Sequence, residues 1–442
     1  MGKQTVFYAA VSAMLLAALP AEAANKYVRK GATGLNNGSD WANAYTELSQ
    51  VSYTGLSGFT LYIAAGSYTS GFPTLSAVNN VTFKRATVAD HGTATGWSAS
   101  FDGQVTSTSS GKFLFVSNSD NFTFDGAGNN PWSFRVVGQN AYDGKFQVEG
   151  STNALIRNIE LDGNGCEPAI ENGPEDGFRL AFNSNFVLEH SYVHNFYYCS
   201  YPNVGNPGHS DGIQMPSAEG AIIRYNRFQN NGMLLFFGDC DWSSQWANDV
   251  HVHHNVFIQQ AGVGDNYRMI DMKGAGHTSA DFVTIENNTF YRESGFTGFT
   301  LYENTNCPAN TSQRTIRNNI FQNGSFDLAG GWGTASNNDF YTGSVGPGSN
   351  NLTSNPLFLS VQALDFHLQA TSPVIGAGLV TTNTEDYDGI PIPTGTRPAM
   401  GAYQYRAAGV PSAPTNLRIT AAAFAFFALT RRRRRSSLGA AR

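Results

Sequence analysis

The chain has 442 residues, with 47 glycines, 17 prolines and a formal net charge of −6. Away from the two ends, residues 24–410 hold 19 basic and 32 acidic side chains, so this body carries about −13. A body that acidic repels nucleic acid and other polyanions at long range. Nucleic acid is therefore excluded as a partner, and an acidic substrate would need local cations or a bound metal.

The N-terminal segment predicts secretion. Lys3 precedes an apolar run from Val6 to Leu19, and Ala21-Glu22-Ala23 places small residues at both positions that signal peptidase reads. The run is shorter than the roughly 20 apolar residues that span a bilayer, which disfavours a membrane anchor. We therefore interpret residues 1–23 as a signal peptide and expect a secreted or cell-surface protein whose mature domain has no stable membrane span.

The central part of the chain is repetitive. The pattern Asn-x-Phe, preceded by alternating apolar residues, recurs at Asn226, Asn255, Asn288, Asn319 and Asn338, and Asn158 and His190 are weaker earlier copies. Alternation of period two, with glycine and asparagine at the bends, predicts strands stacked coil on coil at about 4.8 Å. We predict an all-β, single-stranded, right-handed parallel β-helix with an N-terminal cap over residues 24–345. A β-propeller is the alternative, but it needs four strands in each repeat of about 40 residues.

The repeated asparagines are predicted to form an internal ladder at a bend, in which each side-chain amide bonds the amides above and below it. His190 falls in this predicted slot, so we interpret it as structural and not catalytic. In the segment His251-Val-His253-His254-Asn255, alternation sends His251 and His253 to one face and His254 to the other, which argues against a zinc site.

A second repeat marks another strand in each coil. Asp143-Gly144, Asp176-Gly177 and Asp211-Gly212 each precede a short apolar-alternating run. Continuing that parity predicts one outward column along six coils, about 24 Å long, which suits a polymer of several sugars. The column consists of Gln147, Arg179, Gln214, Phe236, Asp271 and Tyr302, with Lys273 and Asn304 two residues further along. We expect Arg179, Gln214, Phe236, Tyr302 and Asn304 to bind substrate.

The end of the chain has three parts. Residues 346–408 are interpreted as a segment that closes the β-helix, and residues 409–442 as a linker followed by an apolar and arginine-rich tail. The tail is similar to a bacterial surface-sorting signal, and a frameshifted terminus is the rival interpretation. The four cysteines allow three disulfide connectivities; the coil spacing favours Cys166 with Cys199, which leaves Cys240 to pair with Cys307.

These features together resemble the pectate-lyase-like right-handed β-helix proteins of secreted bacterial origin. Tyr27 to Leu48 is similar to the cap that begins many of them, and Asp365 to Gly378 with Arg397 to Tyr405 is similar to their closing segment. The resemblance covers most of residues 26–405. It implies the fold and a polysaccharide substrate, but the same fold hosts lyases, glycoside hydrolases and adhesins that are not enzymes.

The resemblance implies a polysaccharide lyase that cleaves a uronate-containing polymer by β-elimination, with calcium held by acidic side chains and a Lys or Arg as the base. The residues that fit are Lys273, His209 and Asp211 as catalytic groups and Asp239, Asp241 and Asp271 as calcium ligands. A bare Asp271 carboxylate would raise the pKa of Lys273 and weaken it as a base, so this hypothesis needs the metal to cancel the charge.

Other interpretations of these residues stay open. Asp271 and Lys273 could form a surface ion contact, and Asp211 could only shape the turn before Gly212, as Asp143 and Asp176 would before their glycines. A glycoside hydrolase would need two carboxylates about 5 to 10 Å apart, which Asp239, Asp241 and Asp271 could provide. A surface protein that only binds polysaccharide would use the same face. In each case we expect a monomer.

Overall fold

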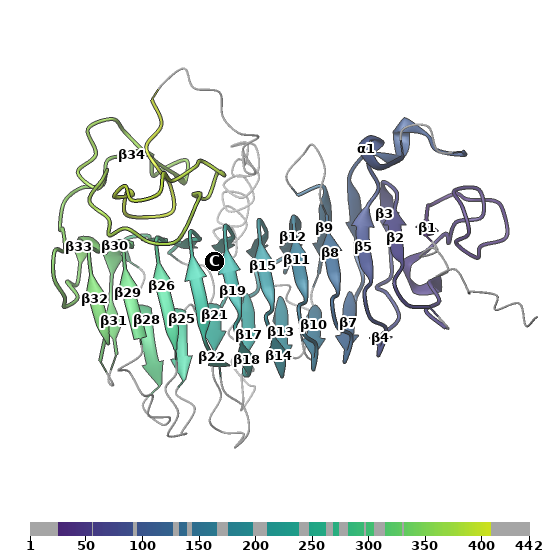
Figure 1. Cartoon of the computed structure of the whole chain (residues 1–442), viewed down its shortest axis with the longest axis horizontal. Coiled ribbons are helices and arrows are strands. Elements are labelled where there is room, and N and C mark those ends of the chain that lie inside the picture. The colour runs from purple at the N-terminus through teal and green to yellow at the C-terminus, as the bar shows by residue number, and fades with distance from the viewer. Residues whose placement is uncertain are drawn as a thin grey trace, which may run out of the picture.

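The structure is a computed structural model that describes residues 25–54, 56–91, 95–126, 132–138, 144–165, 176–197, 210–237, 247–261, 268–273, 282–295, 298–304, 314–328 and 331–407. Three long parallel sheets run side by side along the axis of the molecule (Figure 1). Strands that pair within one sheet come from successive coils, so the chain winds through all three sheets before returning to the first. The predicted parallel β-helix is therefore confirmed. No helix in the described ranges is long and apolar enough to cross a membrane.

Sheet A has eleven strands. In spatial order they are β1 (Lys26–Val28), β2 (Thr60–Ile63), β5 (Thr82–Arg85), β8 (Thr123–Asp125), β11 (Leu155–Arg157), β15 (Val187–Glu189), β19 (Ile222–Arg224), β23 (Val250–His253), β26 (Val283–Glu286), β29 (Arg314–Arg317) and β32 (Thr334–Ser336).

Sheet B follows sheet A in each coil and has ten strands. They are β3 (Gly66–Tyr68), β6 (Val105–Ser107), β9 (Phe134–Val137), β12 (Ile159–Asp162), β16 (Tyr192–His194), β20 (Arg227–Gln229), β24 (Val256–Gln259), β27 (Thr289–Arg292), β30 (Ile320–Gly324) and β33 (Asp339–Gly343).

Sheet C contains the strands that the Asp-Gly repeat predicts, and it has nine members. They are β4 (Leu75–Ser76), β7 (Leu114–Ser117), β10 (Phe146–Glu149), β13 (Phe178–Ala181), β17 (Ile213–Met215), β21 (Met233–Phe237), β25 (Arg268–Lys273), β28 (Phe299–Asn304) and β31 (Phe326–Asp327).

The remaining elements are short. Strands β14 (Asn183–Ser184), β18 (Ala218–Glu219) and β22 (Ala247–Asn248) form a small parallel sheet at the bend between sheets C and A. Strands β34 (Phe358–Ser360) and β35 (Asp365–Leu368) form an antiparallel pair. The helical turns are η1 (Leu48–Gln50), α1 (Val88–His91) and η2 (Ala99–Phe101).

The Asn-x-Phe repeat builds two stacks inside the solenoid. Asn226 Nδ2 donates to Asn255 Oδ1 at 3.1 Å, and Asn255 Nδ2 donates to Asn288 Oδ1 at 3.0 Å. Asn288, Asn319 and Asn338 continue this fully buried ladder. Two residues along, the phenylalanine rings stack with centroids 4.7 to 5.3 Å apart, from Phe228 to Phe340. The predicted ladder is confirmed, and each amide is satisfied where water is excluded.

The placement of His190 and Asn158 in this ladder was wrong by one residue. Ser191 occupies the slot, and its backbone N–H donates to Asn226 Oδ1 at 2.9 Å. His190 and Asn158 precede the slot and adopt left-handed backbone conformations, with φ of 49° and 58°. Asparagine is favoured in that conformation too, so both slots attract the same residue type and the sequence pattern does not separate them.

His254 lies in the same left-handed slot, with φ of 51°, and this changes the expected arrangement of the histidines. The bend interrupts strand alternation, so His254 does not point away from His253, and their Nδ1 atoms are 3.0 Å apart. His251 does not join this pair: its Nε2 lies 2.8 Å from Oε1 of Glu286 on the next coil. Burial lowers the pKa of His254 to about 3, so this ring is neutral at physiological pH.

An exposed asparagine ladder lies at the bend between sheets C and A, which the sequence reading missed. Asn185 Nδ2 donates to Asn153 Oδ1 at 3.0 Å, and Asn121 and Asn80 continue the chain of bonds. All four have φ between 55° and 58°. The bend between sheets A and B and the bend between sheets C and A thus use asparagine in different ways. The ladder at the first bend is buried, and the ladder at the second is in contact with solvent.

The closing segment covers the outer face of sheet B (Figure 1). Before it does so, Asn351 Oδ1 accepts from the Asn338 backbone, which carries the coil pattern past residue 345. Val256, Ile258 and Ile320 on sheet B then pack against an apolar cluster of the segment that includes Phe358, Phe366, Val374, Tyr387, Met400 and Tyr403. This face is therefore occupied by the chain itself.

The outer face of sheet A carries a column of charged residues in register. The charge column is Lys84, Asp125, Arg157, Glu189, Arg224, His253, Glu286 and Arg317. Arg157 and Arg224 approach Glu189 to 3.7 and 2.7 Å, and Arg317 approaches Glu286 to 2.6 Å. Opposite charges thus face each other across most coil boundaries, which favours this register over a slipped one.

Candidate functional site

The predicted outward column lies in register on sheet C. Gln147 pairs with Arg179, and Arg179 pairs with Gln214. The same register continues from Gln214 through Phe236 and Asp271 to Tyr302, and it also places Lys273 opposite Asn304. Residues up to 155 positions apart in the sequence therefore form one row. We call the row from Gln147 to Tyr302 the sheet C column.

Exposure varies along the sheet C column. Arg179, Gln214 and Tyr302 are partly exposed, whereas Gln147, Phe236 and Asp271 are almost completely buried. The expectation of a continuous exposed strip is therefore wrong, although the alignment is right. Strand alternation predicts the side of the sheet on which a residue lies, but it carries no information about the segments that cover that side.

Arg268 organises the part of the column around Asp271, and sequence reasoning missed it. Its guanidinium pairs with the buried Asp271 carboxylate on the same strand. It also lies 3.8 Å from the centroid of the Tyr302 ring on the next coil. Phe299 supports that ring from the same strand, with centroids 5.4 Å apart. A cation, a carboxylate and an aromatic face are thus held together on two adjacent strands.

The pair of Arg268 and Asp271 bears on the expected calcium site. The metal was expected to cancel the Asp271 charge beside Lys273, but Arg268 already supplies a positive charge to that carboxylate. Arg268 contacts one oxygen of this carboxylate, and the role of Asp271 as a calcium ligand stays a prediction. Asp239 and Asp241 lie outside the described residues, as does His209.

Asp211 is held at the turn that begins its strand. Its backbone N–H donates to Asp176 Oδ1 at 3.0 Å, and Asp211 forms a bridge with Met233 on the next coil. Both Asp176 and Asp211 are buried. These contacts support the interpretation that Asp211 shapes the turn before its strand. All four cysteines, and so both expected disulfides, lie outside the described residues.

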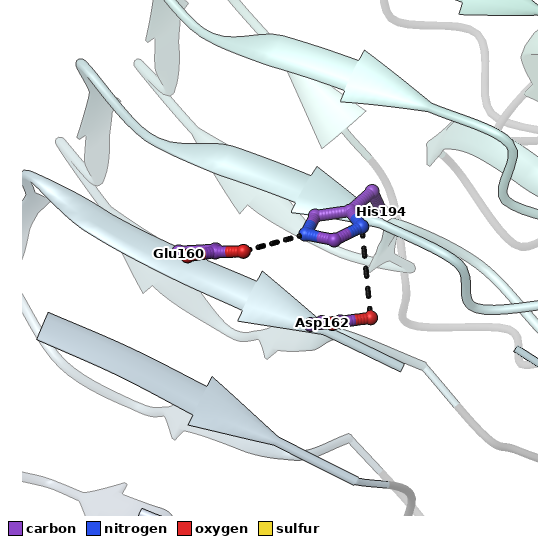
Figure 2. Close-up of side chains that lie close together, drawn as sticks. All are labelled: Glu160, Asp162 and His194. Atoms are coloured by element: carbon purple, nitrogen blue, oxygen red, sulfur yellow. Dashed lines mark hydrogen bonds and ion pairs between the residues drawn. The ribbon is translucent and has the colours of Figure 1, made fainter. Parts of the chain in front are cut away.

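A second polar cluster lies on the outer face of sheet B, where no site was predicted (Figure 2). Glu160 Oε1 is 3.1 Å from Nε2 of His194, and Asp162 Oδ1 is 3.6 Å from Nδ1 of the same ring. Arg135 on the preceding coil contacts both carboxylates, at 3.1 and 2.6 Å. Asp162 and His194 each lie four residues after the equivalent positions Asn158 and His190, so the repeat held the signal for this pair.

The chemistry of this cluster suits an ion-pair network better than a metal site. The three side chains are close enough to be considered as metal ligands. However, the two carboxylates contact opposite nitrogens of the imidazole, and one ion cannot bind both nitrogens of a single ring. Arg135 also places a positive charge against both acids. The cluster therefore joins three coils through contacts of Arg135 and His194 with the two carboxylates.

Comparison with known proteins gives low similarities. No family model and no curated protein matches the chain. Among solved structures, pectate lyase Pel9A aligns at 15% identity and a TM-score of 0.41, over 86% of this chain and 97% of the other. A rhamnogalacturonan lyase aligns at 12% identity and 0.34, over 79% and 95%. PfbA, a surface adhesin of Streptococcus pneumoniae, aligns at 12% and 0.32, over 65% and 68%.

The three parallel sheets and the ladder of the chain itself define its class, which is that of the parallel β-helix proteins. The fold implied by the resemblance to pectate-lyase-like proteins is thereby confirmed. The sheet C column is the part of the structure that bears on activity.

Proposed function

We propose that the chain is an extracellular, monomeric polysaccharide lyase that binds a uronate-containing polymer across sheet C. The observation that carries this proposal is the register of the sheet C column, which aligns six side chains from six successive coils. Secretion is supported by the signal-peptide pattern of residues 1–23. Of the other two outer faces, that of sheet B is covered by the closing segment over several strands, and that of sheet A holds the charge column.

Cations on sheet C address the electrostatic problem that an acidic polymer poses for an acidic protein. The body carries about −13, so a polyuronate is attracted only where positive side chains dominate locally. Arg179 and Arg268 are both partly exposed on this face. A guanidinium matches the two oxygens of a carboxylate, so each arginine is suited to hold one uronate group.

The proposed reaction is a β-elimination. Lys273 takes the proton next to the uronate carboxylate, the released electron pair forms a carbon–carbon double bond, and the bond to the leaving oxygen breaks as that oxygen takes up a proton from water. Arg268 lies five residues before Lys273 on β25 and would stabilise the negative charge that develops on the carboxylate. Tyr302 would stack against a sugar ring, Gln214 lies partly exposed in the same row, and Asn304 follows two residues after Tyr302.

The proposal is tested by incubating the purified chain with polygalacturonate and alginate, with and without a calcium chelator. We expect new ultraviolet absorbance from the unsaturated product, and we expect it to persist in chelator because Arg268 supplies the positive charge at Asp271. Loss of activity in chelator would mean that the elimination requires calcium. New reducing ends without the absorbance would identify a hydrolase, and binding with neither signal would identify an adhesin-like protein. Either of these two results would contradict the lyase.

A further inference from the structure

Phe182 combines two features that are unfavourable in a structural residue. It has a left-handed backbone conformation, with φ of 55°, and its side chain is 55% exposed. A bulky side chain in this conformation costs free energy, and an exposed apolar ring gains little burial to offset that cost. Among the described residues, no aromatic or cation partner contacts the ring.

Neighbouring coils fill the same position with residues that suit it. The register places Phe182 next to Gly150 on the preceding coil and Asn118 on the one before, with φ of 61° and 47°. Glycine and asparagine tolerate this conformation, and phenylalanine does not. Folding therefore does not explain the aromatic residue in this slot.

Tyr225, another bulky left-handed residue, has a packing reason that Phe182 lacks. Tyr225 has φ of 56°, but its side chain is only 3% exposed and its ring stacks on His190 with centroids 5.0 Å apart. Burial and stacking offset the backbone cost at Tyr225. At Phe182 the ring is 55% exposed, so its face is open to a ligand.

The position of Phe182 identifies the class of ligand. It follows β13 directly and lies three residues after Arg179 in the sheet C column, at the bend towards sheet A. A sugar ring offers an apolar C–H face for stacking, and a uronate adds a carboxylate for the arginine. We propose that Phe182 is a stacking platform that holds one sugar of a uronate polymer at the edge of sheet C. This inference rests on the proposed polysaccharide binding and not on cleavage.

The test replaces Phe182 with the residue that its slot favours. Phe182→Asn should weaken polygalacturonate binding about three- to tenfold in affinity electrophoresis, because one aromatic contact is lost. The same change should raise the urea midpoint of unfolding, because asparagine relieves the backbone. Phe182→Tyr keeps the ring and should bind like the unaltered chain.

Phe282 provides the matched control. Its side chain is 46% exposed immediately before β26, three residues further around the same bend, and its φ is not left-handed. Phe282→Asn removes a similar apolar surface and should leave the affinity unchanged.

Three results would overturn the platform. They are unchanged binding by Phe182→Asn, equal losses in the Phe182 and Phe282 variants, and a binding loss accompanied by lower stability. If the unaltered chain bound no uronate polymer, the proposed function and the platform would both fail. Binding without cleavage would remove the lyase alone and leave the platform standing.

Discussion

Sheets A and C share the same coil register, but it aligns different kinds of side chain on each. On sheet A the register brings opposite charges together, as when Glu189 meets Arg157 and Arg224. On sheet C it aligns glutamine, arginine, phenylalanine, aspartate and tyrosine, which do not alternate in charge. A column that neutralises itself is suited to fixing the register of coils. A mixed column that includes partly exposed arginine and tyrosine is suited to contacting a ligand.

The largest expected effect comes from Lys273 on sheet C. Lys273→Ala should lower the rate of elimination by about 10²- to 10⁴-fold, because the base is removed, and should leave the unfolding midpoint unchanged. The measurement is product absorbance with polygalacturonate, alongside urea unfolding. Arg317→Ala on sheet A is the control, and it should lower stability without slowing the reaction. Full activity of Lys273→Ala would show that another group is the base.

The next effect concerns Glu286 in the charge column. Although burial alone would raise the pKa of Glu286, the hydrogen bond from His251 and the charge of Arg317 lower it to about 2. A carboxyl whose folded pKa is depressed contributes stability above its unfolded pKa near 4.5, and this contribution is lost as the pH falls towards 2. Stability should thus fall by about 3 kcal/mol between pH 5 and pH 2 through this group.

Urea unfolding across that pH range measures the effect. Glu286→Gln should flatten the acid limb of the stability profile, and Glu219→Gln, at an exposed position on β18, should leave it intact. An acid limb that is the same in Glu286→Gln and the unaltered chain would contradict the role of the charge column.

The smallest effect uses two arginines on neighbouring coils. Arg179→Ala on sheet C should weaken polygalacturonate binding about tenfold, because a charge-assisted contact to a carboxylate is lost. Arg224→Ala on sheet A should leave binding unchanged and lower stability by about 1 kcal/mol, because its partly exposed pair with Glu189 is lost. Equal affinity losses in both variants would mean that the polymer senses overall charge and not one face.

The sequence repeat predicted which residues align across neighbouring coils. It did not predict residue positions correctly where the backbone departs from a strand conformation. The spacing of Asn226, Asn255 and Asn288 was enough to align the ladder and, through the Asp-Gly repeat, the sheet C column. The charge column was also within reach, since Glu189, Arg224, His253, Glu286 and Arg317 each lie two residues before a ladder position. His190 was misplaced because a left-handed residue shifts the alternation by one.

The chemistry around Asp271 was harder to predict for a different reason. Arg268 has no counterpart in the repeat, so the sequence offered no way to see that it pairs with Asp271 three residues later. The burial of Asp271 and Phe236 likewise depends on what covers sheet C, which strand periodicity does not encode. The sequence therefore predicts the order of residues along this wall better than their surroundings.

The most direct test is a crystal structure of the chain with a bound uronate hexasaccharide. We predict sugar rings that cross the strands of sheet C, with carboxylates at Arg179 or Arg268 and a ring against Tyr302. Sugars bound over the charge column of sheet A, or at the Glu160, Asp162 and His194 cluster of sheet B, would contradict it.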